Sequence, residues 1–146
     1  MEKIINNLKY DNIFLKTDKN SVHSYISYYE KLFKKIRYDN LNILEVGVSR
    51  GGSIRLWSKY FENSNIYGID IFPKKTHEIV YKKLANFGKN ITIYKNNAYS
   101  LNVIEKLFSN IKFDIIIDDG PHTKISQEFF AENYIKLLNP NGILII

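Results

Sequence analysis

The sequence predicts a single α/β domain built on an open, mainly parallel sheet with helices on both faces. Three observations support this prediction. From Leu41 onward, short apolar runs of strand length alternate with segments of helical periodicity, as in repeated strand–helix–strand units. The run at residues 113–117 is continuously apolar, which is typical of a strand buried on both faces. Polar residues follow the ends of four runs, and that edge of a parallel sheet carries the ligand site.

The composition narrows the class of protein. A length of 146 residues suits one domain with a sizeable core. The net charge is +6, but Lys and Arg are spread through both halves without a basic run, so a nucleic-acid partner is only weakly supported. The absence of cysteine rules out disulfides and thiolate metal sites. No stretch approaches the roughly 18 apolar residues of a membrane span, and no signal peptide is present, so we expect a cytoplasmic protein without a membrane partner.

The first 40 residues read as a loop and a helix. Residues 1–21 are polar with a small apolar group at 13–15, and we expect a loop that ends at Ser21 as a helix N-cap. Helical spacing of apolar residues then predicts a helix over residues 22–37. One group in this helix is more typical of core and rim packing than of a binding site: Tyr25, Tyr28 and Tyr29.

From residue 41 the alternation yields five strands and four further helices. The expected strands are residues 42–46, 66–71, 91–95, 113–117 and 143–146. The expected helices between them are residues 53–61, 75–87, 101–108 and 124–138. Right-handed crossovers would place these helices on both faces of the sheet.

A glycine-containing turn joins the first strand to its helix between Ile43 and Ser53. Glycine lets backbone approach a ligand closely, and the start of the helix offers unpaired N–H groups. The spacing is Glu-x-Gly-x-x-x-Gly-Gly-Ser rather than Gly-x-Gly-x-x-Gly. A pyrophosphate needs the second glycine close behind the first, whereas an adenosine with an amino-acid tail does not. The turn therefore favours such a cofactor over the alternative, an ordinary strand–helix turn.

Other strand ends carry further candidates. Asp70 lies at the end of the second strand, where a carboxylate can accept hydrogen bonds from both hydroxyls of a ribose. The alternative role for Asp70 is that of a surface acid that caps the next loop. Glu45 lies near the end of a buried strand and requires hydrogen bonds from a cofactor or from backbone. Asn97 with Ala98 could meet an adenine edge, although Asn97 could equally be a turn residue.

The residues that follow the fourth strand form the cluster best suited to metal binding or acid–base catalysis. Asp118, Asp119 and His122 combine two carboxylates and an imidazole, which suit a divalent cation and a general base. Each acid alone could be a helix cap, and His122 alone could be an ordinary loop residue. Together on the ligand edge they favour a chemical role.

With these residues assembled, the chain resembles the class I methyltransferases that use S-adenosylmethionine. More narrowly, it resembles the macrocin- and mycinamicin-type sugar O-methyltransferases, including relatives labelled cephalosporin hydroxylase. The resemblance covers nearly everything after residue 15. The segments at 51–53 and 118–122 are its more specific parts. The matching segments are Thr17–Lys19, Val22–Tyr25, Tyr29–Glu30, Leu44–Val48, Gly51–Ser53, Trp57, Tyr67–Ile71, Asp118–His122 and Leu138–Gly142.

The resemblance implies a fold and a reaction. The fold is a Rossmann-like sheet with five visible strands in the order 3-2-1-4-5, without the C-terminal strands of the full fold. Residues 1–40 would pack on the cofactor site, and residues 41–146 would form the S-adenosylmethionine-binding domain. The reaction is methyl transfer to a hydroxyl of a sugar or glycoside, with assistance from Mg²⁺. An RNA or other small-molecule methyltransferase, a non-catalytic cofactor-binding or partner subunit, and a homo-oligomer all stay open.

The resemblance also implies roles for individual residues. His122 would be the base that removes the hydroxyl proton. Asp119 would act beside it in catalysis as the Mg²⁺ ligand. The residues implied to bind S-adenosylmethionine are Glu45, Gly47, Ser49, Gly51, Ser53, Asp70, Ile71, Asn97, Ala98 and Asp118.

Several positions depart from the pattern of the family. Pro121 stands where Ser is usual, Asn97 where Asp is usual, and Asn141 where Gly is usual. In the family, an acidic pair that supplies further metal ligands follows the fifth strand, but this sequence stops at Ile146. We therefore expect either a fragment or a shortened relative with a deficient metal site.

Overall fold

The strands form one parallel sheet in the order β3-β2-β1-β4-β5, as the sequence predicts. The computed structural model describes residues 1–11, 25–72, 76–84, 87 and 90–146. The strands are β1 (Asn42–Val46), β2 (Asn65–Asp70), β3 (Ile91–Lys95), β4 (Phe113–Asp118) and β5 (Leu138–Ile145). Because all five run in the same direction, their carboxyl ends meet at one edge of the sheet.

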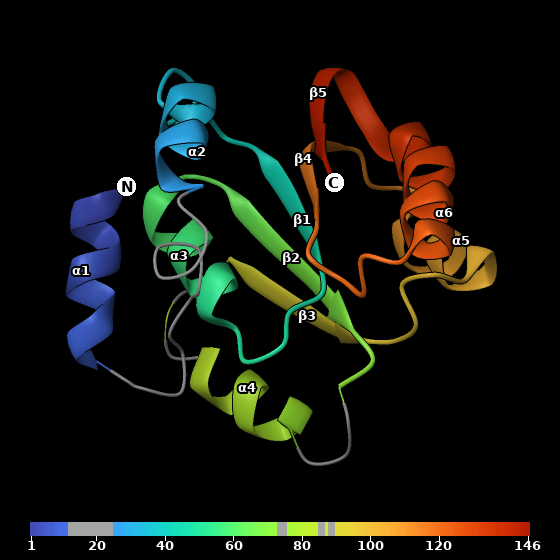
Figure 1. Ribbon diagram of the computed structural model, residues 1–146, viewed down its shortest axis with the longest axis horizontal. Coiled ribbons are helices and arrows are strands. Elements are labelled where there is room, and N and C mark those ends of the chain that lie inside the picture. The colour runs from blue at the N-terminus through green and yellow to red at the C-terminus, as the bar shows by residue number, and fades with distance from the viewer. Residues whose placement is uncertain (12–24, 73–75, 85–86, 88–89) are drawn as a thin grey trace.

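Among the described residues, helices cover both faces of this sheet (Figure 1). On the first side lie α1 (Glu2–Asp11), α2 (Ile26–Phe33), α3 (Gly52–Tyr60) and α4 (Thr76–Leu84). On the second side lie α5 (Leu101–Phe108) and α6 (Lys124–Tyr134), the latter followed by a short 3₁₀ turn, η2 (Ile135–Leu137). Within the described residues, no helix is both long enough and apolar enough to span a membrane.

Alternate side chains of the central strand serve two separate cores. Ile43 packs with the aromatic residues of α2 and α3, including Phe33 and Trp57. Leu44 and Val46 pack in the second core, with the apolar residues of α5 and α6. Successive side chains point to opposite faces, so a strand covered on both sides reads as a nearly unbroken apolar run.

The N-terminal helix α1 is absent from the prediction, which describes residues 1–21 only as polar and ending in a loop. Ile5 is buried, and Met1 and Ile4 pack against the same core as α3. Contact with the folded body therefore stabilises this short segment, and the helical pattern of so few apolar residues is weak. The predicted cap at Ser21 and the predicted helix start at residue 22 lie outside the described residues; α2 ends at Phe33, earlier than predicted.

The last helix and the last strand also differ from the prediction. Helix α6 ends at Tyr134, and β5 begins at Leu138 rather than at residue 143. Pro140 looks like an interruption in the sequence, but β5 lies at the edge of the sheet, where proline is tolerated beside an irregular register. Asn141 has φ 66°, a conformation that asparagine adopts more readily than most residues, which accounts for asparagine at a position where the family has glycine.

Candidate functional site

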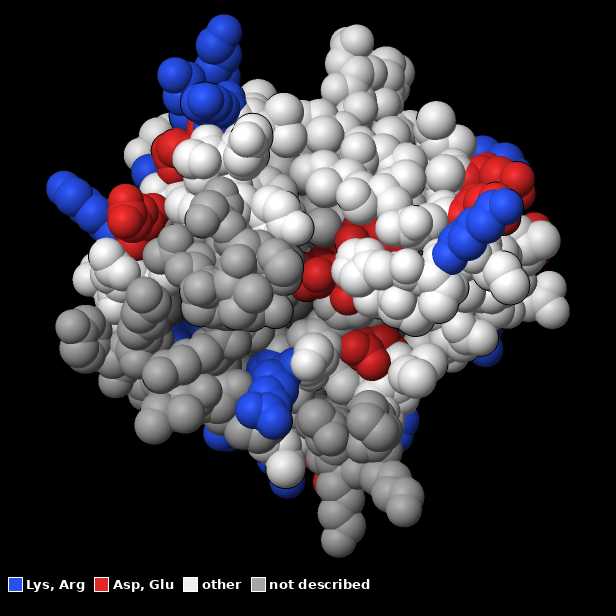
Figure 2. All heavy atoms as spheres, viewed as in Figure 1, with Lys and Arg blue, Asp and Glu red and all other residues white. Residues whose placement is uncertain are grey.

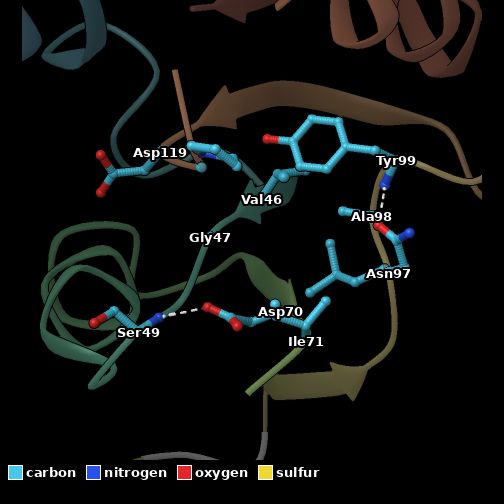
Figure 3. A pocket seen from close by; sticks show the side chains of 12 residues that line it. Val46, Gly47, Ser49, Asp70, Ile71, Asn97, Ala98, Tyr99 and Asp119 are labelled. Atoms are coloured by element: carbon cyan, nitrogen blue, oxygen red, sulfur yellow. Dashed lines mark hydrogen bonds between the residues drawn. The ribbon is translucent and has the colours of Figure 1, made fainter. Parts of the chain in front are cut away.

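A cavity of about 460 Å³ opens at the carboxyl ends of β1, β2, β3 and β4. Figure 3 shows Asp70 and Ile71 on one side, Tyr99 on the opposite side, and Asn97 and Ala98 between them. The lining residues are Val46, Gly47, Ser49, Ile69, Asp70, Ile71, Asn97, Ala98, Tyr99, Asp119, Gly120 and Pro121. Seven of the predicted site residues are among them: Gly47, Ser49, Asp70, Ile71, Asn97, Ala98 and Asp119.

Packing against the loop after β4 restricts the residue type at Gly47, whether or not a ligand is bound. Its φ is 88°, and a Cβ built on it would lie 2.2 Å from the carbonyl oxygen of Asp119. The Asp119 amide in turn donates a hydrogen bond to the Val46 carbonyl at 2.7 Å. The loops after β1 and β4 therefore meet backbone to backbone, and a larger residue at this position would force them apart.

Asp70 holds two loops through backbone amides. Its Oδ2 accepts hydrogen bonds from the amides of Val48 (2.9 Å) and Ser49 (2.8 Å). Its Oδ1 accepts one from the amide of Phe72 (2.7 Å). A carboxylate offers about four lone-pair positions, so roughly one is left for a ligand hydroxyl. Ser49 and Phe72 both have positive φ, at 48° and 44°, and these bonds stabilise that strained backbone.

Three predicted residues near the turn after β1 do not line the cavity. Glu45 is fully buried, and its Oε2 accepts a hydrogen bond from the Ser53 hydroxyl at 2.6 Å. This bond ties β1 to the first turn of α3. Gly51, with φ 80°, packs against Val80 and Leu84 of α4. These contacts support the turn.

Tyr99 connects the loop after β3 to the loop after β4, and the sequence gives no hint of it. Its amide donates to Oδ1 of Asn97 at 3.0 Å, and its hydroxyl donates to Oδ1 of Asp118 at 2.7 Å. Burial, together with the hydrogen bond and negative charge of Asp118, raises the pKa of Tyr99 far above its usual range. The phenol therefore stays protonated and remains a donor at neutral pH.

The two adjacent acids after β4 lie in different environments. Asp118 is 3% exposed; its Oδ1 accepts from Tyr99 and from the amide of Gly120, while its Oδ2 has no hydrogen-bond partner in the described part of the chain. Asp119 is more exposed, and its carboxylate points away from Tyr99 in Figure 3. Asp118 lines a second cavity rather than the first, and Asp119 lines both.

His122 stands beside Asp119 at the start of α6. Its Nε2 lies 3.8 Å from Oδ1 of Asp119, and half of its side chain is exposed. Its φ is 52°. A capping box follows at once, because the Thr123 hydroxyl accepts from the Ser126 amide and the Ser126 hydroxyl accepts from the Thr123 amide. This cap fixes the point at which the loop carrying His122 ends.

The described residues contain no group of three or more His, Asp or Glu side chains arranged to hold a metal ion. The predicted Mg²⁺ ligand, Asp119, has His122 as its partner at 3.8 Å. Figure 2 shows acidic atoms gathered in a hollow near the middle of the face, where the carboxyl ends of β4 and β2 lie. Basic atoms lie below and to the left of these acidic atoms in the same view.

Comparisons with known proteins bear on the family and the fold of this chain. A family described as methyltransferase domain matches residues 44–146. The 8-demethyl-8-alpha-L-rhamnosyl tetracenomycin-C 2'-O-methyltransferase of Streptomyces olivaceus is 29% identical over 139 residues, which are 89% of this chain and 34% of that protein. The mycinamicin VI 2''-O-methyltransferase of Micromonospora griseorubida is 27% identical over 133 residues, 86% of this chain and 31% of that protein.

A solved structure shares the same architecture. The MycE methyltransferase from the mycinamycin biosynthetic pathway, in complex with Mg, SAH and mycinamycin VI, matches with a TM-score of 0.64 and 26% identity. The match covers 90% of this chain and 35% of that one. The chain thus spans about a third of the length of the proteins that it matches.

Proposed function

Because the chain belongs to the methyltransferase-domain family, we propose that it transfers a methyl group from S-adenosylmethionine to a hydroxyl of a sugar or glycoside. The observation that carries the proposal is one edge of the sheet: a cavity bounded by Asp70, Asn97 and Tyr99, with His122 and Asp119 beside it. The two relatives are named as O-methyltransferases, one of them of a rhamnosyl compound, and the related solved structure contains SAH.

The residues of the first cavity fit S-adenosylmethionine. A volume of about 460 Å³ lies within the range of small-molecule sites. Ile69, Ile71 and Ala98 offer apolar contact to a flat ring. Asp70 retains an acceptor position for a ribose hydroxyl, and the exposed amide of Asn97 can pair with a polar ring edge. When bound, the cofactor would supply an electrophilic methyl group.

In this proposal His122 removes the proton from the acceptor hydroxyl. A hydroxyl is a weak nucleophile at neutral pH and requires a base at the moment of transfer. The oxygen forms a bond to the methyl carbon, the bond between that carbon and sulfur breaks, and the imidazole takes the proton. The Asp119 carboxylate, 3.8 Å away, stabilises the imidazolium that results. Alignment of the reacting atoms contributes up to about 7–11 kcal/mol in such reactions.

Mg²⁺ does not fit the described residues as a site built by the protein. Magnesium prefers octahedral oxygen coordination. Asp119 offers one accessible carboxylate, whereas Oδ1 of Asp118 is occupied by Tyr99 and Gly120. No step of the proposed reaction therefore passes through a metal ion.

The test measures binding and transfer separately. Calorimetry with S-adenosylmethionine should show binding, and a labelled methyl group should appear on a panel of neutral glycosides that includes rhamnosides. Binding without transfer to any acceptor would favour a cofactor-binding subunit. Transfer to RNA, with steep salt dependence of RNA binding, would favour an RNA methyltransferase. Absence of cofactor binding by the folded chain would contradict the proposal.

A further inference from the structure

A second cavity, of about 710 Å³, adjoins the first at Asp119. Its walls come from α2 and the residue before it, from the end of β4 and the loop that follows, and from α6 and β5. His122 lines this cavity and not the first. A molecule in the second cavity would therefore lie beside the proposed base and next to the proposed cofactor site.

One wall of the cavity is aromatic and accessible. Tyr25 and Tyr28 are 48% and 71% exposed, and both line the cavity. The sequence suggests that the tyrosines of this segment pack in the core or at its rim; Tyr29 packs in the core, and Tyr25 lies at its rim with its ring edge-on to Tyr29. The Tyr29 ring stacks on Phe33 and packs edge-on against Trp57. The exposed rings offer apolar faces to a ligand.

Another part of the lining is polar and carries two carboxylates. Asp118, Asp119, His122 and Gln127 form it, and none of the described lining residues is Lys or Arg. The buried Oδ2 of Asp118 lacks a hydrogen-bond partner in the part of the chain that the structure describes. A buried carboxylate oxygen without a donor is unfavourable, so a ligand that supplies a hydroxyl there would be favoured and an anion would be repelled.

We propose that this cavity binds the acceptor sugar through two features of this chain. The ring of a neutral glycoside lies against Tyr25 and Tyr28, and one of its hydroxyls donates to Oδ2 of Asp118. A second hydroxyl then stands beside His122. Asp118 is thus a residue that orients the acceptor, held in place by its bonds to Tyr99 and Gly120. This inference rests on the proposed function, because it assigns that reaction's acceptor to a place in the fold.

The first experiment uses methyl α-L-rhamnopyranoside as the probe, with saturation-transfer NMR on the full chain in the presence of S-adenosylhomocysteine. Saturation should reach the ring C–H protons. The double variant Tyr25→Ala/Tyr28→Ala should weaken binding about 2- to 10-fold. Tyr38→Ala is the matched control: Tyr38 is exposed but lies outside the cavity, so the signal should persist. Equal signals from the double variant and the wild type would overturn the inference.

The second experiment tests Asp118. In Asp118→Asn, a carbonyl oxygen can still accept from Tyr99 and Gly120, while an amide replaces Oδ2. The KM for the rhamnoside should rise about 10- to 150-fold, with the melting temperature and S-adenosylhomocysteine affinity unchanged. An unchanged KM would overturn the assignment. If Asp118→Asn does not fold, the double tyrosine variant still tests whether the second cavity binds the rhamnoside.

A charged probe provides an independent test that requires no variant of the protein. Rhamnose 1-phosphate should bind more weakly than the neutral rhamnoside because two carboxylates face it. Equal or tighter binding of the phosphate would contradict the inference. Calorimetry with S-adenosylhomocysteine separates the two proposals. If this ligand binds but the rhamnoside does not bind at Tyr25 and Tyr28, only this inference is contradicted. If S-adenosylhomocysteine does not bind, the proposed function is contradicted.

Discussion

Asp70 has two tasks at the scale of a single residue. The sequence predicts a ligand contact at the end of β2, and the cavity includes this carboxylate. The three amide bonds from Val48, Ser49 and Phe72 could not be predicted, because they depend on how two loops fold back on the strand end. The carboxylate therefore organises the turn after β1 before any ligand arrives.

Asp70→Ala should weaken S-adenosylmethionine binding by roughly 10- to 150-fold, the loss expected for a charge-assisted hydrogen-bonded contact. The same change should lower the free energy of unfolding, because three backbone amides lose their acceptor. Calorimetry and urea denaturation measure the two effects. Unchanged affinity in a folded variant would remove Asp70 from the cofactor site.

His122→Ala should slow methyl transfer by about 10²- to 10⁴-fold, the usual contribution of a general base. Cofactor affinity should hardly change, because His122 does not line the first cavity. Single-turnover kinetics with calorimetry separates these effects. Parallel loss of rate and cofactor affinity would instead indicate that the side chain supports the loop.

The site residues differ in whether their roles could be predicted from the sequence. Asp119 and His122 stand out because carboxylates and imidazole after a buried strand have few structural explanations. Tyr99 does not stand out, because a tyrosine after a turn has no special meaning until its contact with Asp118 is known. Glu45 and Ser53 are predicted to bind the cofactor, but they bond to each other and do not line the first cavity, because the depth at which a residue is buried cannot be read from its spacing in the sequence.

At the scale of elements, periodicity predicts β1, β3 and α5 with their observed bounds. Each of these elements carries several residues of one periodic pattern close together in the sequence. Helix α1 is different, because its attachment depends on partners remote in sequence. The Met1 ammonium lies 2.6 Å from Oε2 of Glu30 in α2, and Oε1 of Glu30 accepts from the Tyr60 hydroxyl of α3.

This junction predicts a pH dependence of stability. Burial raises the pKa of Glu30, but the hydrogen bond and charge of the N-terminal ammonium, with Tyr60 and Arg37, outweigh it and lower the pKa below its ordinary value of 4.5. The carboxylate therefore stabilises the fold above about pH 4.5, and this contribution is lost as the pH falls through the folded-state pKa.

The measurement compares wild type with Glu30→Gln by urea denaturation at pH 7, 5.5 and 4. The difference in free energy of unfolding should be largest at neutral pH and should shrink at pH 4. Burial and Glu30 raise the pKa of Tyr60 to about 12, so the phenol stays a donor over this whole range. If the difference in free energy of unfolding does not change with pH, packing of the Glu30 side chain, and not its charge, stabilises this junction.

At the scale of the whole molecule, the parallel sheet gathers four loops at one edge. The strand order could be predicted because it follows from the family resemblance and the alternation of elements. The second cavity could not, because it forms between α2 and β5, which are far apart in the chain.

This arrangement predicts weak magnesium binding by the 146-residue chain, with or without the cofactor. Asp119 supplies a single accessible carboxylate, and Mg²⁺ depends on the few carboxylates that a protein offers. Titration calorimetry with MgCl₂ should give little heat, and Asp119→Asn should barely alter it. Tight binding that Asp119→Asn abolishes would show that the metal site is complete.

Asp119 belongs to the walls of both cavities, and Tyr99, in the first cavity, holds Asp118 in the second. A shared wall makes the two sites thermodynamically linked, since a molecule that steadies it in one position alters the affinity of the other site. Linkage is reciprocal: whatever factor the cofactor product applies to sugar affinity, the sugar must apply to the product. Under the two proposals above, this coupling would change both affinities by the same factor, so a change in the shared wall would be measurable from either site.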